Sequence, residues 1–208
     1  MDFRPRALIL GLTGSIAAGK SAVARMLQGK GAALVDADQV SRDLTGPGSP
    51  VLSRLVERFG SEILDSDGRL DRAVLALRVF NSAGDLEALN EITHPAIWKE
   101  SLFRLAELGA THPVVVLMAP LLLEHGAEAI VDQVWVVDLP LEEQLRRLTD
   151  RDGLPRDEAL RRIRSQMPSA EKAARADVLI DNSGTLDQTS ALVDAAWEDW
   201  VAPLLAPS

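Results

Sequence analysis

The sequence predicts an α/β fold in which helices cover a central parallel sheet of five strands. Short apolar runs, typical of buried strands, alternate along the chain with helical patterns. The first apolar run leads into a glycine-rich loop and then a helix, the arrangement of a phosphate-binding loop. The chain has 208 residues and a hydrophobic fraction of 47%, which suffices for one domain with smaller insertions.

The phosphate-binding loop organises the rest of the chain. It reads G-x-x-x-x-G-K-S, between a strand over residues 7–12 and a helix that begins near residue 21. Loop N–H groups and the helix N-terminus attract anions, Lys20 adds a charge on the phosphates, and the Ser21 hydroxyl can hold Mg²⁺. The pattern therefore predicts a continuous set of nucleotide-binding residues: Gly14, Ser15, Ile16, Ala17, Ala18, Gly19, Lys20, Ser21 and Ala22.

Two carboxylates follow the second predicted strand, which covers residues 32–35. Ligands of open parallel sheets bind at the carboxyl ends of strands, so Asp36 and Asp38 are placed for chemistry. We interpret Asp38 as the base that orients an acceptor hydroxyl, or as a carboxylate linked to Mg²⁺. Either residue could instead cap the following helix, and for Asp36 both interpretations stay open.

Residues 45–111 are predicted to form a helical insertion that holds a second substrate. A cluster of helix breakers covers residues 45–50, and helical patterns then fill the chain until the next strand. This is more chain than one crossover helix needs. We expect a kink or break just before Pro95, and His94 could contact an anionic ligand or serve the structure alone.

The second half of the chain completes the sheet and adds a lid. Three strands are expected over residues 114–118, 134–138 and 178–181, so that residues 7–44, 112–145 and 176–203 form the nucleotide-binding core. Residues 146–175 carry nine basic and five acidic side chains, although the whole chain has a net charge of −9. This basic segment indicates a mobile lid that closes over phosphates, or else a solvated amphipathic helix.

Composition excludes several classes of protein. A net charge of −9 argues against a general nucleic-acid binder, and the absence of cysteine excludes thiolate metal sites and disulfides. The three histidines lack metal-ligand spacing, and no dinucleotide fingerprint is present. The first apolar run is too short for a signal peptide or a membrane span. We expect a cytoplasmic monomer that binds neither nucleic acid nor membrane.

The order of motifs along residues 8–184 resembles the dephospho-coenzyme A kinases. The stretches that carry the resemblance are GLTGSIAAGKS at 11–21, DAD at 36–38 followed by Arg42, LNEITHP at 89–95, PLLLE at 120–124, Arg147 and Arg151-Asp152 in the lid, Gln166, and ADVLIDNSG at 176–184. The family pattern opens GLTGGIGSGKS, so Ala17 and Ala18 replace Gly-Ser. These alanines are tolerable if their φ angles are negative. Met118 stands where an Asp is common, which leaves Mg²⁺ to Ser21, Asp38 and water.

The resemblance implies a phosphate-loop kinase similar in fold to nucleoside monophosphate kinases. The implied reaction transfers the γ-phosphate of ATP, with Mg²⁺, to the ribose 3′-hydroxyl of dephospho-coenzyme A, the last step of coenzyme A synthesis. The implied catalytic residues are Lys20, Asp38, Arg147 and Arg151. The implied acceptor-binding residues are Asp36, Asp38, Arg42, His94, Pro120, Leu121 and Glu124. The rival interpretations are another small-molecule kinase, acting on a nucleoside or nucleotide, and a nucleotide-dependent switch without transfer chemistry.

Overall fold

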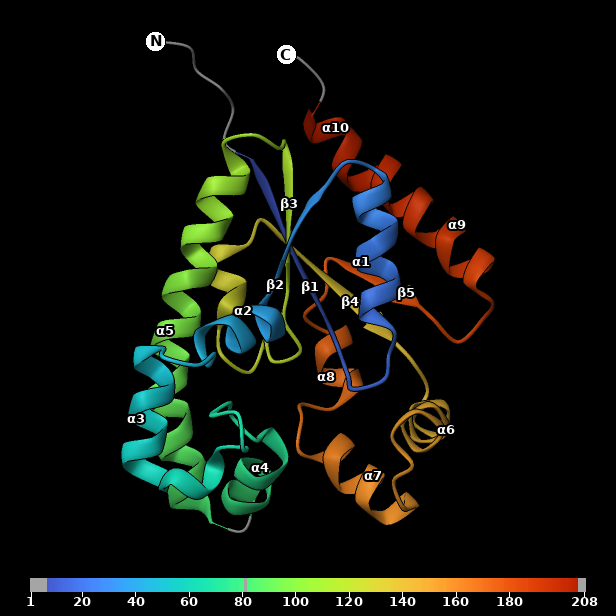
Figure 1. The fold of residues 1–208 in the computed structure, drawn as a ribbon. Helices are drawn as coiled ribbons and strands as arrows, with labels where there is room; N and C mark the ends of the chain where they lie inside the picture. Colours follow the sequence, from blue (N-terminus) through green and yellow to red (C-terminus); the bar gives the residue numbers. More distant parts are fainter. Residues whose placement is uncertain (1–6, 81, 206–208) are drawn as a thin grey trace. The chain divides into compact units, whose positions relative to one another are not determined.

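The computed structural model describes residues 7–80 and 82–205, and it confirms the predicted α/β fold (Figure 1). A five-stranded sheet has the strand order β2-β3-β1-β4-β5. The pairs β1–β3, β1–β4 and β4–β5 are all parallel. The strands are β1 (Leu8–Gly14), β2 (Ala33–Asp36), β3 (Val114–Met118), β4 (Gln133–Asp138) and β5 (Val178–Asp181).

Helices and loops connect these strands. The α-helices are α1 (Lys20–Gly29), α2 (Ala37–Leu44), α3 (Pro50–Phe59), α4 (Arg72–Phe80), α5 (Ala83–Gly109), α6 (Leu141–Asp152), α7 (Arg156–Arg164), α8 (Ser169–Ala173), α9 (Leu186–Ala196) and α10 (Ala202–Leu205). Short 3₁₀ helices cover Ser61–Ile63 and Ala127–Ile130, and a π-helical turn covers Trp197–Val201. Across the described ranges, no helix is long and apolar enough to cross a membrane.

The chain divides into two compact units. The sheet unit comprises Met1–Val35 and Leu105–Ser208, and the helical unit comprises Asp36–Arg104. In the sheet unit, β1 lies at the centre of the sheet, and α1 and α9 pack together against it (Figure 1). Their shared core includes Leu10, Leu12, Trp135 and Val193, all with 0% exposure. The central position of β1 brings the loop after it to the carboxyl edge of the sheet, where parallel sheets bind ligands.

The helical unit has an apolar core of its own. Leu55 and Phe59 of α3, Leu75 of α4 and Ile92 of α5 form its centre. The α5 helix runs unbroken from Ala83 to Gly109 with Pro95 inside it, so the break that we expected there does not occur. A proline removes one helical hydrogen bond, but the helix packs against this core on both sides of it. Tertiary packing outweighs the local preference.

Candidate active site

The phosphate-binding loop follows β1 and ends at the first residue of α1. Gly14 has φ 148° and Gly19, the N-cap of α1, has φ 97°. A Cβ at Gly14 would lie 2.3 Å from the carbonyl oxygen of Val137, and one at Gly19 would lie 2.0 Å from Nδ2 of Asn182. Both positions therefore need glycine for conformation and for space, which explains the two glycines of the motif.

Ala17 has an unusual backbone conformation in the loop. Its φ is 61°, in the left-handed region, so the negative φ under which we judged alanine tolerable there is not found at Ala17. The left-handed conformation costs a non-glycine residue roughly 1–2 kcal/mol. The loop holds Ala17 in a conformation that glycine adopts without this cost.

Replacing Ala17 by glycine is expected to stabilise the chain by about 0.5–1 kcal/mol. The gain is the released strain, less the greater entropy of glycine in the unfolded chain. Urea denaturation measures it. The control is Ala18→Gly, because Ala18 has no positive φ and is fully buried, so this variant should lose about 1 kcal/mol. An equal loss of unfolding free energy in both variants would contradict the claim that the backbone at Ala17 is strained.

Side chains around the loop hold it in place. Lys20 donates from Nζ to the carbonyl oxygens of Gly14 (2.8 Å) and Ser15 (3.0 Å). The backbone N–H of Ile16 donates to Oε1 of Gln166 (2.9 Å), and the hydroxyls of Ser15 and Ser169 lie 2.8 Å apart. The loop therefore contacts the segment between α7 and α8, which belongs to the predicted lid.

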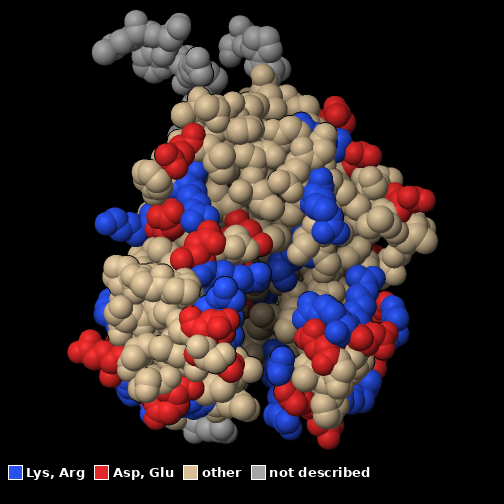
Figure 2. Space-filling model, in the orientation of Figure 1, with Lys and Arg blue, Asp and Glu red and all other residues tan. Residues whose placement is uncertain are grey.

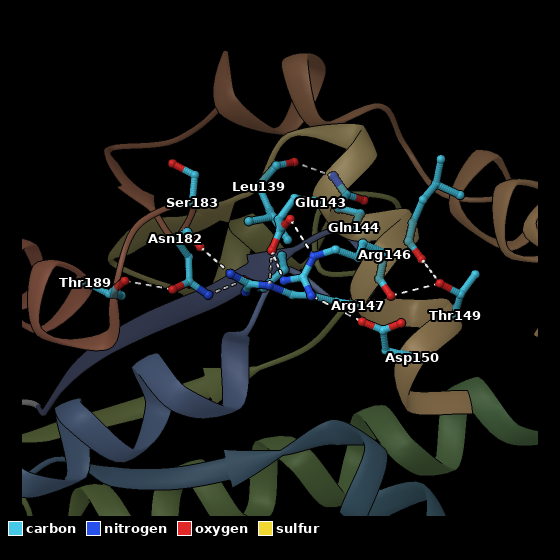
Figure 3. A network of polar contacts seen from close by, with 12 residues as sticks. Leu139, Glu143, Gln144, Arg146, Arg147, Thr149, Asp150, Asn182, Ser183 and Thr189 are labelled. Carbon is cyan, nitrogen blue, oxygen red and sulfur yellow. Dashed lines mark hydrogen bonds and ion pairs between the residues drawn. The ribbon is translucent and has the colours of Figure 1, made fainter. Parts of the chain in front are cut away.

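Asn182 joins the loop to the last strand of the sheet, a role that the sequence did not reveal. It follows β5 and is 6% exposed. Its Nδ2 donates to the carbonyl of Ala18 (2.7 Å), and its Oδ1 accepts from the hydroxyl of Thr189 (2.7 Å). Its carbonyl accepts from Arg147 (2.9 Å), as Figure 3 shows. Asn182 therefore links the phosphate-binding loop, the helix α9 and Arg147 of α6 at a point beside Gly19.

Arg147 lies at the centre of this polar network (Figure 3). Its Nε donates to Oε1 of Glu143 (3.3 Å), one helical turn earlier on α6. Hydrogen bonds from Arg146, and then from Arg147, lower the pKa of Glu143 to about 2. Glu143 therefore stays ionised at neutral pH and orients Arg147. A Cβ at Gly19 would lie 3.6 Å from a terminal nitrogen of Arg147, so this guanidinium lies directly beside the phosphate-binding loop.

Arg151 has different neighbours from Arg147, although it lies one turn further along α6. It forms a bidentate ion pair with Asp152 (2.6 and 2.9 Å), and its side chain is 60% exposed. Hydrogen bonding to Asp152 raises the pKa of Arg151. Basic and acidic side chains gather together over α6 and α7 in the lower right of Figure 2. The structure therefore brings Arg147 to the loop and shows no such contact for Arg151 within the described part of the chain.

The segment after β3 contacts the predicted lid through a buried ion pair. Glu124 pairs with Nζ of Lys172 (2.8 Å), which is fully buried, and accepts from the N–H of Met167 (3.0 Å). Burial alone would raise the pKa of Glu124, but these hydrogen bonds outweigh it and the net pKa is lowered. Lys172 also donates to the carbonyl of Pro120 (2.7 Å), while Leu121 is 36% exposed. Acceptor binding by Pro120, Leu121 and Glu124 stays a prediction.

Replacing Lys172 by methionine is expected to lower the free energy of unfolding by about 3 kcal/mol, because it leaves the Glu124 carboxylate without its cation. Denaturation at pH 7 measures the loss. Since the pKa of Glu124 is lowered in the folded chain, the contribution of the pair is lost as the pH falls below about 4.5, and the two proteins should then converge. Lys30→Met is the control.

Lys30 forms a more exposed pair with Asp194 (2.6 Å), and such pairs contribute about 0–1 kcal/mol. Equal losses in the two lysine variants, at neutral pH, would contradict the structural importance of the buried pair.

The two predicted carboxylates lie at the start of the helical unit. Asp36 is the N-cap of α2, and its Oδ1 accepts from the N–H groups of Asp38 (2.9 Å) and Gln39 (3.4 Å). The capping interpretation, which we left open, therefore holds for Asp36. Asp38 lies in the first turn of α2 and is exposed. Its carboxylate accepts neither of the two capping hydrogen bonds, which both go to Asp36, and its role as a base stays a prediction.

Two arginines and a histidine of the helical unit belong to the surroundings of Asp38 or of a nearby cavity. Arg42 is exposed one turn further along α2. Arg72, which the sequence did not single out, begins α4 and lies within electrostatic range of both Arg42 and Asp38. Arg72 and His94 both line a cavity of about 330 Å³ inside this unit. Our sequence criteria missed Arg72 because an isolated arginine at the start of a helix is usual on a protein surface.

Taken together, the fold and the loop define a phosphate-loop kinase of small molecules. Comparison with protein families gives a match to the dephospho-CoA kinase model over residues 8–188. The chain is 47% identical over 198 residues to a dephospho-CoA kinase of Carboxydothermus hydrogenoformans, covering 92% of this chain and 96% of that one. It is 47% identical over 187 residues to that of Corynebacterium glutamicum, covering 88% and 92%. The chain belongs to the dephospho-CoA kinase family, and it is an ATP-dependent kinase.

Solved structures agree with this assignment. A protein of Thermus thermophilus superposes with a TM-score of 0.80 at 34% identity, covering 95% of this chain and 100% of that one. A dephospho-CoA kinase of Campylobacter jejuni gives 0.71 at 25% identity, covering 95% and 98%. A shikimate kinase of Acinetobacter baumannii gives 0.53 at 15% identity, covering 96% of each chain. The last likeness shows the shared fold alone.

Proposed function

We propose that this chain transfers the γ-phosphate of ATP to the ribose 3′-hydroxyl of dephospho-coenzyme A, giving coenzyme A and ADP. The observation that carries the proposal is the match to dephospho-CoA kinases across almost the whole chain, at 47% identity over 92% of its length. The reaction forms a bond between the 3′-oxygen and the γ-phosphorus. It breaks the bond from that phosphorus to the oxygen that leaves with ADP.

The donor phosphates bind at the loop between β1 and α1. The N–H groups of residues 14–22 and the N-terminus of α1 supply donors and positive potential, and Lys20 adds its charge. Arg147 lies beside the loop, tied to Asn182 and Glu143, and is therefore already oriented when the nucleotide arrives. A preoriented cation stabilises the charge that builds up during transfer without further reorganisation.

The acceptor is bound by the helical unit, with Asp38 as the base. Asp38 orients the 3′-hydroxyl and takes its proton as the new bond forms. Arg42 and His94 help to bind the anionic acceptor, and Arg151 joins the site when the lid closes. We propose residues 45–111 as the acceptor-binding insertion and residues 146–175 as the lid, within one kinase domain. The support is the charge pattern and the helical core of this region.

Magnesium fits the donor side without a dedicated protein site. Mg²⁺ keeps several waters and phosphate oxygens as ligands, so one protein oxygen suffices. The Ser21 hydroxyl is exposed in the first turn of α1, and no group of three His, Cys, Asp or Glu residues able to hold a metal occurs within the described ranges. The ion would neutralise phosphate charge during transfer. Met118 is 7% exposed and offers no oxygen in place of the common Asp.

The remaining expectations rest on the sequence alone. A monomer, a cytoplasmic location and the absence of a nucleic-acid partner stay predictions from charge and composition. The rival functions are a kinase of another small molecule and a nucleotide-dependent switch. The fold shared with shikimate kinases does not separate these, because unrelated acceptors occur on one fold.

A panel of acceptors tests the proposed function. The chain is incubated with ATP, Mg²⁺ and either dephospho-coenzyme A, nucleosides, nucleotides or shikimate, and new phosphomonoesters are detected by phosphorus NMR. We expect dephospho-coenzyme A to be phosphorylated at the 3′ position with the highest kcat/KM. Transfer to another member of the panel, with none to dephospho-coenzyme A, would replace the proposed acceptor. ATP binding without transfer to any of them would favour the switch.

A further inference from the structure

A cavity inside the helical unit lies next to the charged residues that the acceptor needs. Its volume is about 330 Å³, and its walls come from α2, α3, α4 and α5 and the segment before α4. Most of the lining is apolar, including Leu55, Leu75 and Leu89, while Asn90 and His94 add polar groups. A long, partly apolar chain with a few amide groups fits such a lining.

Arg72 borders this cavity and is held in a fixed orientation. Asp71 caps α4 by accepting from the N–H groups of Ala73 and Val74 (3.0 Å each), which places Arg72 as the first residue of the helix. The guanidinium donates to the hydroxyl of Thr45 (2.6 Å), which is 4% exposed. One terminal nitrogen of the guanidinium is thus held by a buried hydroxyl, while the Arg72 residue is otherwise exposed. A preoriented guanidinium is the side chain best suited to bind phosphate oxygens.

The charges around Arg72 point to an anionic ligand. Partial burial lowers the pKa of Arg72, Arg42 lowers it further, and Asp38 opposes this shift. Two guanidinium groups held within electrostatic range repel each other, and a bound anion would relieve that repulsion. Arg72 therefore connects two features of the helical unit: it lies within electrostatic range of the Asp38 carboxylate and of Arg42, and it lines the apolar cavity.

The acceptor carries groups that are complementary to a carboxylate base, a cation and an apolar cavity. In dephospho-coenzyme A the ribose with its 3′-hydroxyl is followed by the 5′-diphosphate, and the diphosphate by the pantetheine arm. We propose that the cavity receives the pantetheine arm and that Arg72 binds the diphosphate. This inference rests on the proposed function and deepens it, because it assigns the arm a place that the motifs of the sequence leave open.

Competition with the free arm tests the assignment. The probe is 4′-phosphopantetheine, which has the arm and one phosphate but no nucleoside. We expect it to inhibit competitively against dephospho-coenzyme A and not against ATP. Calorimetry without ATP measures its binding directly, whatever the transfer assay shows. Binding at the ATP site alone, or no binding at all, would overturn the assignment of the cavity.

Filling the cavity should weaken binding of the acceptor without affecting binding of ATP. Ala76 lines the cavity from α4, so Ala76→Leu is expected to raise the KM for dephospho-coenzyme A and the Kd for 4′-phosphopantetheine by roughly tenfold or more. The KM for ATP should not change. The control is Ala73→Leu, an exposed position on the same helix that does not line the cavity. Equal behaviour of the two leucine variants would overturn the proposal.

Removing the cation tests the second half of the proposal. Arg72→Gln should raise the KM for dephospho-coenzyme A by roughly 10- to 100-fold through loss of a charged hydrogen bond, with the KM for ATP unchanged. Arg69→Gln is the matched control, since the Arg69 side chain is 67% exposed and pairs only loosely with Asp67 (3.8 Å). An unchanged KM in Arg72→Gln would overturn the role of Arg72. If the unmodified chain phosphorylates dephospho-coenzyme A while these variants behave like their controls, the proposed function stands and the cavity assignment fails.

Discussion

Replacing Asp38 by asparagine is expected to lower kcat by about two to four orders of magnitude, the usual contribution of a general base. Asparagine has nearly the same shape but cannot accept the proton of the acceptor hydroxyl. ATP should bind as before, because the donor phosphates bind at the loop of the sheet unit. Steady-state kinetics with dephospho-coenzyme A measures the rate, and calorimetry with an ATP analogue measures donor binding.

Asp36→Asn is the control for this experiment. Asp36 caps α2 through its Oδ1, and asparagine is as good a cap as aspartate, so both stability and kcat should stay close to those of the unmodified chain. The pair of variants therefore separates a carboxylate used for chemistry from one used for structure, two residues apart. Full activity of Asp38→Asn would contradict the assignment of Asp38 as the base. The acceptor would then be positioned by the cations that bind it, without a general base at this residue.

Replacing Arg147 by glutamine is expected to lower kcat by roughly two to three orders of magnitude, with a smaller effect on the KM for ATP. The reason is its position: the guanidinium lies beside Gly19 and is oriented by Glu143 and by the carbonyl of Asn182. Glutamine cannot carry the charge that stabilises the transferring phosphoryl group. Single-turnover kinetics would show the loss in the chemical step and not in product release.

Arg151→Gln is the comparison for the lid. Arg151 is bound to Asp152 in this structure, so it contributes to transfer only if the lid closes and that pair opens. A fall in kcat of at least tenfold would place it in the closed site, and an unchanged rate would show that the resemblance assigned it wrongly. If Arg147→Gln kept full activity as well, the segment over α6 and α7 would be a solvated surface, which was the alternative interpretation of its charges.

Features that depend on neighbouring residues could be predicted from the sequence. The phosphate-binding loop is one, because the strand, the glycines and the helix that create it are contiguous. The strands of the sheet are others, since each is a short apolar run that contributes buried side chains to the core. Asp36 marks the limit, because a carboxylate after a strand looks the same whether it caps a helix or binds a ligand.

Features that depend on contacts between distant residues could not be predicted from the sequence. Asn182 forms a hydrogen bond with Ala18, which lies 164 residues away in the sequence, and no local pattern predicts this bond. The positive φ of Ala17 is imposed by the folded loop against the preference of alanine. The helix around Pro95 stays intact because it packs on both sides of the proline. Arg72 could not be singled out, because the cavity that it lines is formed by residues from several separate helices.

The contact between Asn182 and the loop also has a consequence for how the chain acquires its activity during synthesis. The central strand β1 is made first, but both of its partners, β3 and β4, lie more than 100 residues later. The loop also needs Asn182, which is synthesised after the last strand, because the Asn182 side chain holds the carbonyl of Ala18. Such long-range pairing makes folding slow. A ribosome-bound fragment that ends before β5 should therefore show no ATP binding, and binding should begin only when the end of the chain has emerged.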